Sequence, residues 1–421
     1  MNEKVAKCLL VSKVLVADGM MTDDERGFLE AMMTKLGLDA DERRRVVELD
    51  GWDEAEPRLR ALSEDQRRAL IAELVDAASS DGRLSAHELA AIQRVAAELG
   101  VAGSRMVRTL QQRIAELRTL DVADPTTPAK LRAALQATTG AVVAAAAKLV
   151  EEHGVEAAVS ELAPAFARLC EQGAKRDPGC RGKLAIARAL HTLERWDDDV
   201  FVAALRYEQL EGWGAEDTAA DLRGVAGLAH AHFGRADALD VLAGLLCDKQ
   251  RATRIAAAQA LGDAGRPDAS ALLRFKLLIG DEEPQVLSAC LEALFALARA
   301  ASYDFVVGLL AAYDERAEVA ALALGGARFA EAVEPLTRWC IGAPTEQRHR
   351  IGYLALALLR NDAATAYLLD AVRSNGRIDA VAAGRALATF KDDAAIEEQL
   401  RAAASEQRDP AARRELTELL Q

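Results

Sequence analysis

The chain has 421 residues and a formal net charge of −14; hydrophobic residues make up 51% of it and aromatic residues only 4%. The length allows two or three domains or one long array, and an apolar fraction carried mostly by alanine, leucine and valine favours packed helices over sheets. The acidic balance argues against a general nucleic-acid-binding protein, because phosphate binding requires a basic surface. The composition therefore predicts an all-α protein.

Cysteine spacing and hydropathy indicate where the protein resides. The six cysteines are scattered and form no Cys-x-x-Cys pair, so we expect reduced thiols in the cytoplasm rather than a zinc knuckle or a redox pair. Lysines interrupt the apolar residues of the N-terminus, which therefore lacks the continuous core of a signal peptide. No uncharged run approaches the roughly 18 apolar residues of a membrane-spanning helix, so no transmembrane segment is expected.

The first 118 residues contain an internal duplication. Residues 17–25 read Ala-Asp-Gly-Met-Met-Thr-Asp-Asp-Glu, and residues 80–88 read Ser-Asp-Gly-Arg-Leu-Ser-Ala-His-Glu. The two copies align without a gap. In each copy a glycine can end one helix, and Thr or Ser followed three residues later by glutamate forms a capping box that starts the next. The duplication thus predicts two helix–turn–helix joints.

The same joints carry carboxylates that could instead hold a divalent cation such as Ca²⁺, Mg²⁺ or Mn²⁺. Neither copy has the ligand spacing of an EF-hand loop, so helix capping and cation binding stay open as alternatives. The candidate ligands are Asp18, Asp23, Asp24, Glu25, Asp81 and Glu88.

This pair of joints, in a helical segment of about a quarter of the chain, resembles the tellurite-resistance TerB family. The resemblance implies a compact helical bundle whose two acidic joints lie near each other, with acidic residues proposed to bind metal. By position these are Asp18, Glu25, Asp81 and Glu88. The second joint departs from the acidic pattern, since Ala86 and His87 stand where the first has Asp23 and Asp24.

Three consecutive arginines, Arg43, Arg44 and Arg45, follow the first joint among acidic residues. They are either a contact for a partner or phosphate, or the solvated face of a short helix. Further along, prolines at positions 125 and 128 break the helical pattern, and we place a linker at residues 119–128. The predicted organisation is a bundle over 1–118, irregular helical repeats over 129–235 and a regular array over 236–421.

Helices are expected over 129–152, 155–172 and 180–195, followed by the least regular segment, 198–234. Trp196 precedes this segment and Trp213 lies within it. These tryptophans either anchor a protein partner or fill a gap between two repeats. The histidines His230 and His232 point about 200° apart on a helix, which argues against a shared metal. Cys180 is either a buried structural cysteine or a thiol whose pKa is lowered at a helix start.

One unit is repeated through residues 236–421: an apolar helix, an acidic turn and an alanine-rich helix. The units begin near Asp237, Pro267, Ser302, Glu331, Ala363 and Ala394. Within one of them, Gly325 and Gly326 are expected to allow close helix packing.

The units resemble HEAT repeats, in the short bacterial form also described as similar to phycobilisome lyase repeats. The best copies are Ala238–Gly262 and Ala269–Ala298, and the acid–proline turn of the family stands at Glu283-Pro284 and Asp409-Pro410. The resemblance implies an α-solenoid of stacked helix pairs with a concave surface lined by second helices. A protein partner is expected on that surface.

No nucleotide-binding loop, hydrolase elbow or zinc-protease motif occurs in the sequence. The leading hypothesis is a non-enzymatic scaffold with a cation-responsive N-terminal domain. The resemblance to TerB gives an alternative, a component of a tellurite or metal stress response that acts with membrane-associated proteins. A second alternative is a bilin lyase-like protein, because lyase subunits for phycobiliproteins carry similar repeats.

Overall fold

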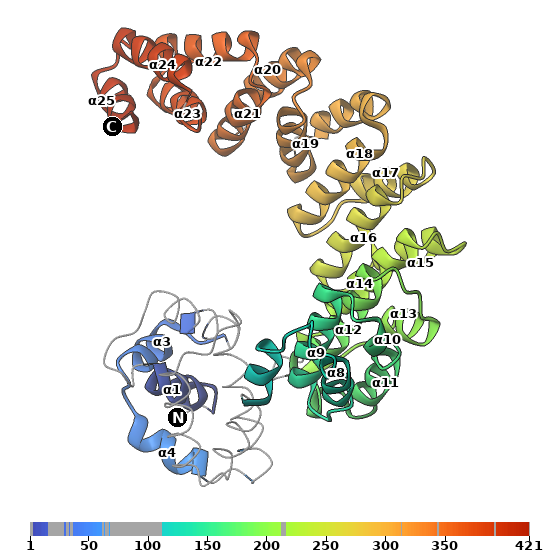
Figure 1. Ribbon diagram of the computed structural model, residues 1–421. Helices are drawn as coiled ribbons and strands as arrows, with labels where there is room; N and C mark the ends of the chain where they lie inside the picture. The colour runs from blue at the N-terminus through green and yellow to red at the C-terminus, as the bar shows by residue number, and fades with distance from the viewer. Residues whose placement is uncertain are drawn as a thin grey trace. The chain divides into compact units, whose positions relative to one another are not determined.

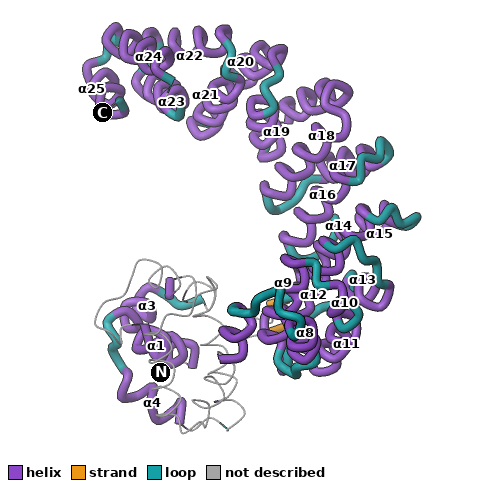
Figure 2. Tube along the Cα trace, in the orientation of Figure 1, coloured by secondary structure: helices purple, strands orange, loops and turns teal. Residues whose placement is uncertain are grey.

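The computed structural model describes residues 3–15, 29–30, 33, 37–60, 63, 67, 112–211, 216–312, 314–342, 345–390 and 393–420 (Figure 1). The chain divides into two compact units, Met1–Ala226 and Gly227–Gln421. Most of the described residues are helical, and they include one short pair of strands (Figure 2). The predicted all-α class is therefore confirmed, whereas the domain limits drawn from the sequence stay predictions.

Three described helices form the N-terminal part of the first unit: α1 (Glu3–Leu15), α3 (Ala40–Val47) and α4 (Trp52–Arg60). Helix α1 packs against both of the others and buries the side chains of Cys8, Leu9 and Leu10 completely. Helix α3 starts with a capping box, in which the Glu42 N–H donates to Asp39 Oδ1 at 2.9 Å and the Asp39 N–H donates to Glu42 Oε2 at 3.1 Å. The Lys13 ammonium lies 3.9 Å from the centre of the Trp52 ring.

The rest of this unit consists of helix pairs and one hairpin. Its elements are α8 (Thr127–Leu135), α9 (Gly140–His153), α10 (Glu156–Val159), α11 (Leu162–Gln172), η1 (Gly173–Lys175), η2 (Pro178–Cys180), α12 (Arg181–Thr192), α13 (Asp198–Ala204), β1 (Leu210–Glu211), β2 (Glu216–Asp217) and α14 (Ala220–His232), the last crossing into the second unit. Helices α9 and α12 pack directly on each other.

Two details of this segment differ from the sequence prediction. The single helix expected over 155–172 is broken into α10 and α11 at Ser160 and Glu161. Pro164 explains the break, because its ring would clash with the carbonyl of Ser160, four residues earlier, in a continuous helix. The irregular segment also contains an antiparallel strand pair that was not predicted, with Leu210 opposite Asp217 and Glu211 opposite Glu216.

The second unit consists of helix pairs in series. Its elements are α15 (Ala238–Leu245), α16 (Arg251–Asp263), α17 (Ala269–Ile279), α18 (Pro284–Leu309), η3 (Leu310–Ala312), α19 (Glu315–Gly326), η4 (Ala330–Ala332), α20 (Val333–Ile341), α21 (Glu346–Leu359), α22 (Asp362–Ser374), α23 (Arg377–Ala388), α24 (Ala394–Glu406) and α25 (Pro410–Leu419). The predicted repeat starts coincide with the first helices of these pairs, except that the start at Ser302 lies inside α18.

Helix α18 belongs to two repeats. Its backbone leaves helical geometry at Ala298, with φ −154° and ψ 60°, so the first half is the second helix of one repeat and the second half is the first helix of the next. Among the described residues, the stretch Pro284–Ala312 is long and apolar enough to cross a membrane. Because it contains charged residues, a search for an uncharged run misses it. Its two halves pack against α16, α17 and α19, and this repeat packing accounts for its apolar residues.

The second helices stack on one another in the order α16, α18, α19, α21, α23 and α25. Glycine allows the close approach at three of these contacts. A methyl group on Gly262 would lie 3.0 Å from Ala293, one on Gly325 would clash with the carbonyl of Ala355, and one on Gly384 would clash with Leu416. A methyl group on Gly326 would meet no neighbouring atom. The packing role predicted for the two adjacent glycines is therefore confirmed for Gly325 alone.

The two adjacent glycines therefore provide a matched pair of substitutions. Gly325→Ala should destabilise the contact between α19 and α21 by about 1–3 kcal/mol, because the added methyl group overpacks it. Gly326→Ala should be neutral or stabilising by up to about 1 kcal/mol, since it adds helix propensity in open space. Native-state hydrogen exchange of α19 and α21 in the full-length protein measures both effects. Equal protection in the two variants would contradict the assigned contact.

Candidate interaction surface

The acidic residues predicted as metal ligands, Asp18, Asp23, Asp24, Glu25, Asp81 and Glu88, lie outside the described residues. Trp213 lies outside them as well. Within the described ranges, no group of three or more His, Cys, Asp or Glu side chains is placed to hold a metal ion. The cation hypothesis for the two joints thus stays a prediction.

The arginine trio lies on α3, where each side chain contacts its own helix or the adjoining turns. Arg44 pairs with Asp41 at 2.7 Å, Arg45 lies 3.6 Å from Asp50, and the Arg43 Nε–H donates to the carbonyl of Leu38 at 3.0 Å. These local partners match the arrangement expected of a solvated helix face. A role for Arg43, Arg44 and Arg45 in partner binding stays a prediction.

Trp196 packs within its own repeat. Its ring stacks on the buried ring of Phe201, with 4.9 Å between the ring centres, and its indole N–H donates to Asp198 Oδ1 at 2.9 Å. The side chain is half-buried. This arrangement suits the filler alternative, because the tryptophan covers the start of α13; its role as a partner anchor stays untested.

Three other residues singled out in the sequence, the histidine pair and Cys180, have defined environments. His230 is buried whereas His232 is exposed, as expected for residues on opposite sides of α14. Cys180 is buried, and this burial raises the pKa of its thiol to about 12 despite the nearby Lys183. The alternative of a lowered-pKa thiol at Cys180 is therefore wrong, and the cysteine is a structural residue.

A buried polar centre, missed by the sequence analysis, is built around Asp177 in the turn before α12. The Asp177 side chain is fully buried, and its two oxygens accept hydrogen bonds from the N–H groups of Gly182 at 2.7 Å and Lys183 at 3.0 Å. A carboxylate in this place satisfies donors at the start of the helix and is favoured by the helix dipole. Asp177 thereby fixes the turn and the first residues of α12.

Lys183 supplies the opposite charge. Its side chain is fully buried, and its Nζ lies 2.9 Å from Asp177 Oδ2 as an ion pair without the alignment of a hydrogen bond. The same Nζ lies 5.1 Å from the centre of the Tyr207 ring, and burial raises the pKa of the Tyr207 hydroxyl well above its usual range. A buried charge keeps its ionised form only when it is paired in this way.

Two side chains connect the strand pair to this centre: Gln209, which immediately precedes β1, and Glu211 of β1. The Gln209 amide donates to the Asp177 carbonyl at 2.8 Å and to Glu211 Oε1 at 2.6 Å. Glu211 Oε1 also accepts from the Gly179 N–H at 2.8 Å and from the Thr218 hydroxyl at 2.6 Å. The hairpin between α13 and α14 is thus anchored on the turn of the preceding repeat.

In the second unit, the turns before second helices contain further buried ion pairs. Arg254 of α16 binds both oxygens of Asp281 at 2.8 Å, and Lys276 of α17 lies 2.7 Å from the same carboxylate. Burial opposes ionisation of Asp281, but the hydrogen bonds from Arg254, Lys276 and the Glu283 N–H outweigh it and lower the Asp281 pKa. This carboxylate joins two neighbouring repeats.

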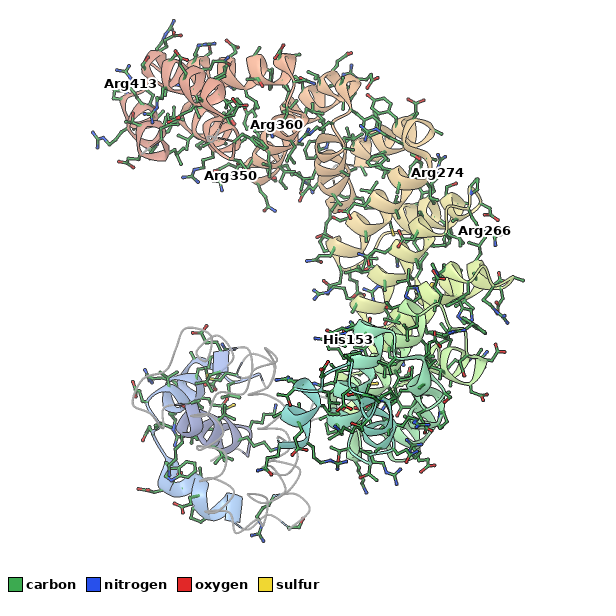
Figure 3. The ribbon with its side chains drawn as sticks, in the orientation of Figure 1. His153, Arg266, Arg274, Arg350, Arg360 and Arg413 are labelled. Atoms are coloured by element: carbon green, nitrogen blue, oxygen red, sulfur yellow. The ribbon has the colours of Figure 1, made fainter. Side chains whose placement is uncertain are left out.

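Two ion pairs and one histidine–carboxylate hydrogen bond also join the later second helices to one another. Arg348 of α21 lies 2.8 Å from Glu318 of α19, and His349 of α21 lies 3.0 Å from Asp379 of α23. Arg377 of α23 pairs with Glu415 of α25. Nearby, the exposed Arg350 pairs with Glu346 within α21 (Figure 3). Polar contacts therefore join α19 to α21, α21 to α23, and α23 to α25.

Comparison with known families agrees with this architecture. Residues 4–111 match the family model of tellurite resistance protein TerB, and residues 212–294 match that of HEAT repeats. The chain thus has a TerB-like region followed by HEAT-like repeats. Helix pairs with the same order and packing continue beyond the matched residues as far as α25. No curated protein matches the chain.

The buried pair of Asp177 and Lys183 gives a quantitative expectation. Lys183→Met should destabilise α12 by about 3–5 kcal/mol, because it leaves the Asp177 carboxylate buried without its counter-charge. Lys148→Met is the matched control, since Lys148 is exposed and makes only a 3.6 Å pair with Glu152. Hydrogen exchange of α12 in the full-length protein measures both. A similar response in the two variants would show that the pair contributes no more than a surface contact.

Proposed function

We propose that the protein is a non-enzymatic scaffold whose HEAT repeats bind a protein partner along their second helices. The unbroken stacking of α16, α18, α19, α21, α23 and α25 carries this proposal, because it places equivalent side chains of successive repeats in rows. HEAT repeats form a protein-interaction architecture, and no catalytic motif accompanies them in the sequence. The partner surface is the face of the second helices that other helices of the array leave uncovered.

One such row contains side chains of different chemistry. Each of five second helices has a buried leucine at the same place, and the residue two positions before it belongs to this row. The leucines are Leu261, Leu294, Leu324, Leu356 and Leu387. In order the residues of the row are Gln259, Glu292, Leu322, Leu354 and Arg385. Gln259, Glu292 and Arg385 are exposed, and the two leucines between them are half-buried. A row that is acidic at one end, apolar in the middle and basic at the other suits a specific partner rather than a general one.

Affinity capture with cross-linking, using the full-length protein, tests the scaffold. The wild-type chain should retain a partner in stoichiometric amount, and the charge reversal Glu292→Arg with Arg385→Glu should weaken that retention at least about tenfold. The control exchanges the exposed pair on α20, Glu334→Arg with Arg338→Glu, which preserves an i,i+4 attraction away from the second helices. A wild-type chain that retains no partner, or a partner kept equally by both variants, would overturn the proposal.

The TerB match supports a second candidate, a cation-responsive component of a tellurite or metal stress response acting with membrane-associated proteins. This function would reside in the two acidic joints. A change in cation occupancy there would alter the N-terminal domain while the HEAT repeats hold the partner.

Calorimetric titration of the full-length protein with Ca²⁺, Mg²⁺ and Mn²⁺ tests this candidate. Saturable binding should occur and should be lost in the variant Asp18→Ala, Asp81→Ala, because oxygen ligands are removed from both joints. Asp41→Ala is the control, since it removes an exposed acid of α3 that lies in neither joint. Absence of binding, with the double variant merely less stable, would leave helix capping as the role of the joints. Unchanged growth of a deletion strain on tellurite would further count against the stress function.

A further inference from the structure

The first helices of four successive repeats end in the same way. Each closes with two buried residues and then an exposed residue without charge. These exposed residues are Cys247, Leu278, Ala311 and Ile341, and α17 adds Phe275 and Ile279 beside Leu278. We call these six residues the first-helix edge. They belong to first helices and are distinct from the second-helix row of the scaffold proposal.

The centre of this edge is an apolar stripe on α17. Phe275, Leu278 and Ile279 are 61%, 55% and 57% exposed, and their i, i+3, i+4 spacing places them on one face of the helix. The opposite face of α17 buries Leu273 and Leu277 against the array. Ile341, at the equivalent end of α20, is 69% exposed. Large apolar side chains gathered in this way on a soluble surface mark a binding site for another molecule.

The electrostatics of the edge favour a basic partner. Glu282 is exposed in the turn after α17, and Glu315 is exposed as the first residue of α19; neither forms an ion pair within the described part of the chain. The helix ends themselves present the negative pole of the helix dipole. Arg316, the nearby cation, is engaged by Asp314 at 2.5 Å and donates to the Leu278 carbonyl at 2.6 Å. Lys249 is the exposed cation of the preceding turn, one repeat away from the stripe.

The form of the stripe favours a helix as the partner's conformation. Phe275, Leu278 and Ile279 follow the i, i+3, i+4 spacing of one helix face. An apolar face of this kind is the surface against which an amphipathic helix packs, with its own apolar residues set between those of the stripe.

We propose that the first-helix edge binds an amphipathic helix that carries an apolar seam flanked by lysine or arginine. This inference goes beyond the scaffold proposal, because it names a second surface and the chemistry of its partner. The apolar seam covers Phe275, Leu278 and Ile341, and the basic flank meets Glu282 and Glu315. A protein with this edge and the second-helix row holds two different partners on one array.

Fluorescence anisotropy with the full-length protein tests the edge directly. The probe is a labelled synthetic helix of about 20 residues with leucine at every a and d position and lysine beside them. Phe275→Asp with Leu278→Asp should weaken its binding at least about tenfold, because two anchors of the seam lose their contact. Ile378→Asp, at a site on α23 that is 58% exposed, is the matched control and should leave binding unchanged.

A second pair of measurements isolates the charge. The variant Glu282→Lys with Glu315→Lys should weaken binding of the lysine-flanked helix and strengthen binding of the same helix with glutamate flanks. This variant keeps the apolar stripe, so a fault in folding of the aspartate variant cannot mimic the result. No binding to the wild-type chain, or equal loss in the Ile378→Asp control, would overturn the proposal.

Two outcomes separate this inference from its alternatives. If sedimentation shows that the wild-type chain self-associates and that Phe275→Asp abolishes the association, the occupant is a second copy and the proposal is wrong. If the captured partner is lost with the Glu292 and Arg385 variant and no synthetic helix binds the edge, the scaffold stands and this inference falls. If no partner is captured but the lysine-flanked helix binds at Phe275 and Leu278, the scaffold proposal fails and the edge stands.

Discussion

The close packing of successive second helices is the contact on which the rest of the array depends. Gly262, Gly325 and Gly384 have no side chain where the next second helix approaches, and alanines surround them. A pair of HEAT helices cannot bury its own apolar faces, so each repeat gains its stability from its neighbours. Bonds such as the Arg254–Asp281 pair then fix the register between repeats, because a slip would leave buried charge unpaired.

The buried centre at Asp177 joins segments that are distant in the chain. Asp177 binds the first residues of α12 and pairs with Lys183. Gln209 and Glu211 attach the strand pair β1–β2 to the same turn. The buried polar groups of this region are therefore satisfied by one another.

The second unit presents two chemically different surfaces. The second-helix row varies from Glu292 to Arg385 and suits a partner with matching charges, whereas the first-helix edge concentrates exposed apolar side chains beside the carboxylates of Glu282 and Glu315. The two surfaces lie on different helices of each repeat, so each of the two proposals can be tested without altering the other surface.

The sequence by itself determined the helical class, the repeat phase and the position of the turns, because these follow from local periodicity, capping residues and proline. It could not decide which of Gly325 and Gly326 faces the next helix, since that depends on the rotation of α19 in the array. It also pointed to Trp196 and not to the buried pairing of Asp177 with Lys183 and Gln209. The pairing of Gln209 with Asp177 joins residues that are distant in the chain, and the exposure of Phe275 and Ile341 depends on what neighbouring helices cover. Only the tertiary structure decides such features, because burial and long-range pairing are properties of the packed repeats and not of any one segment.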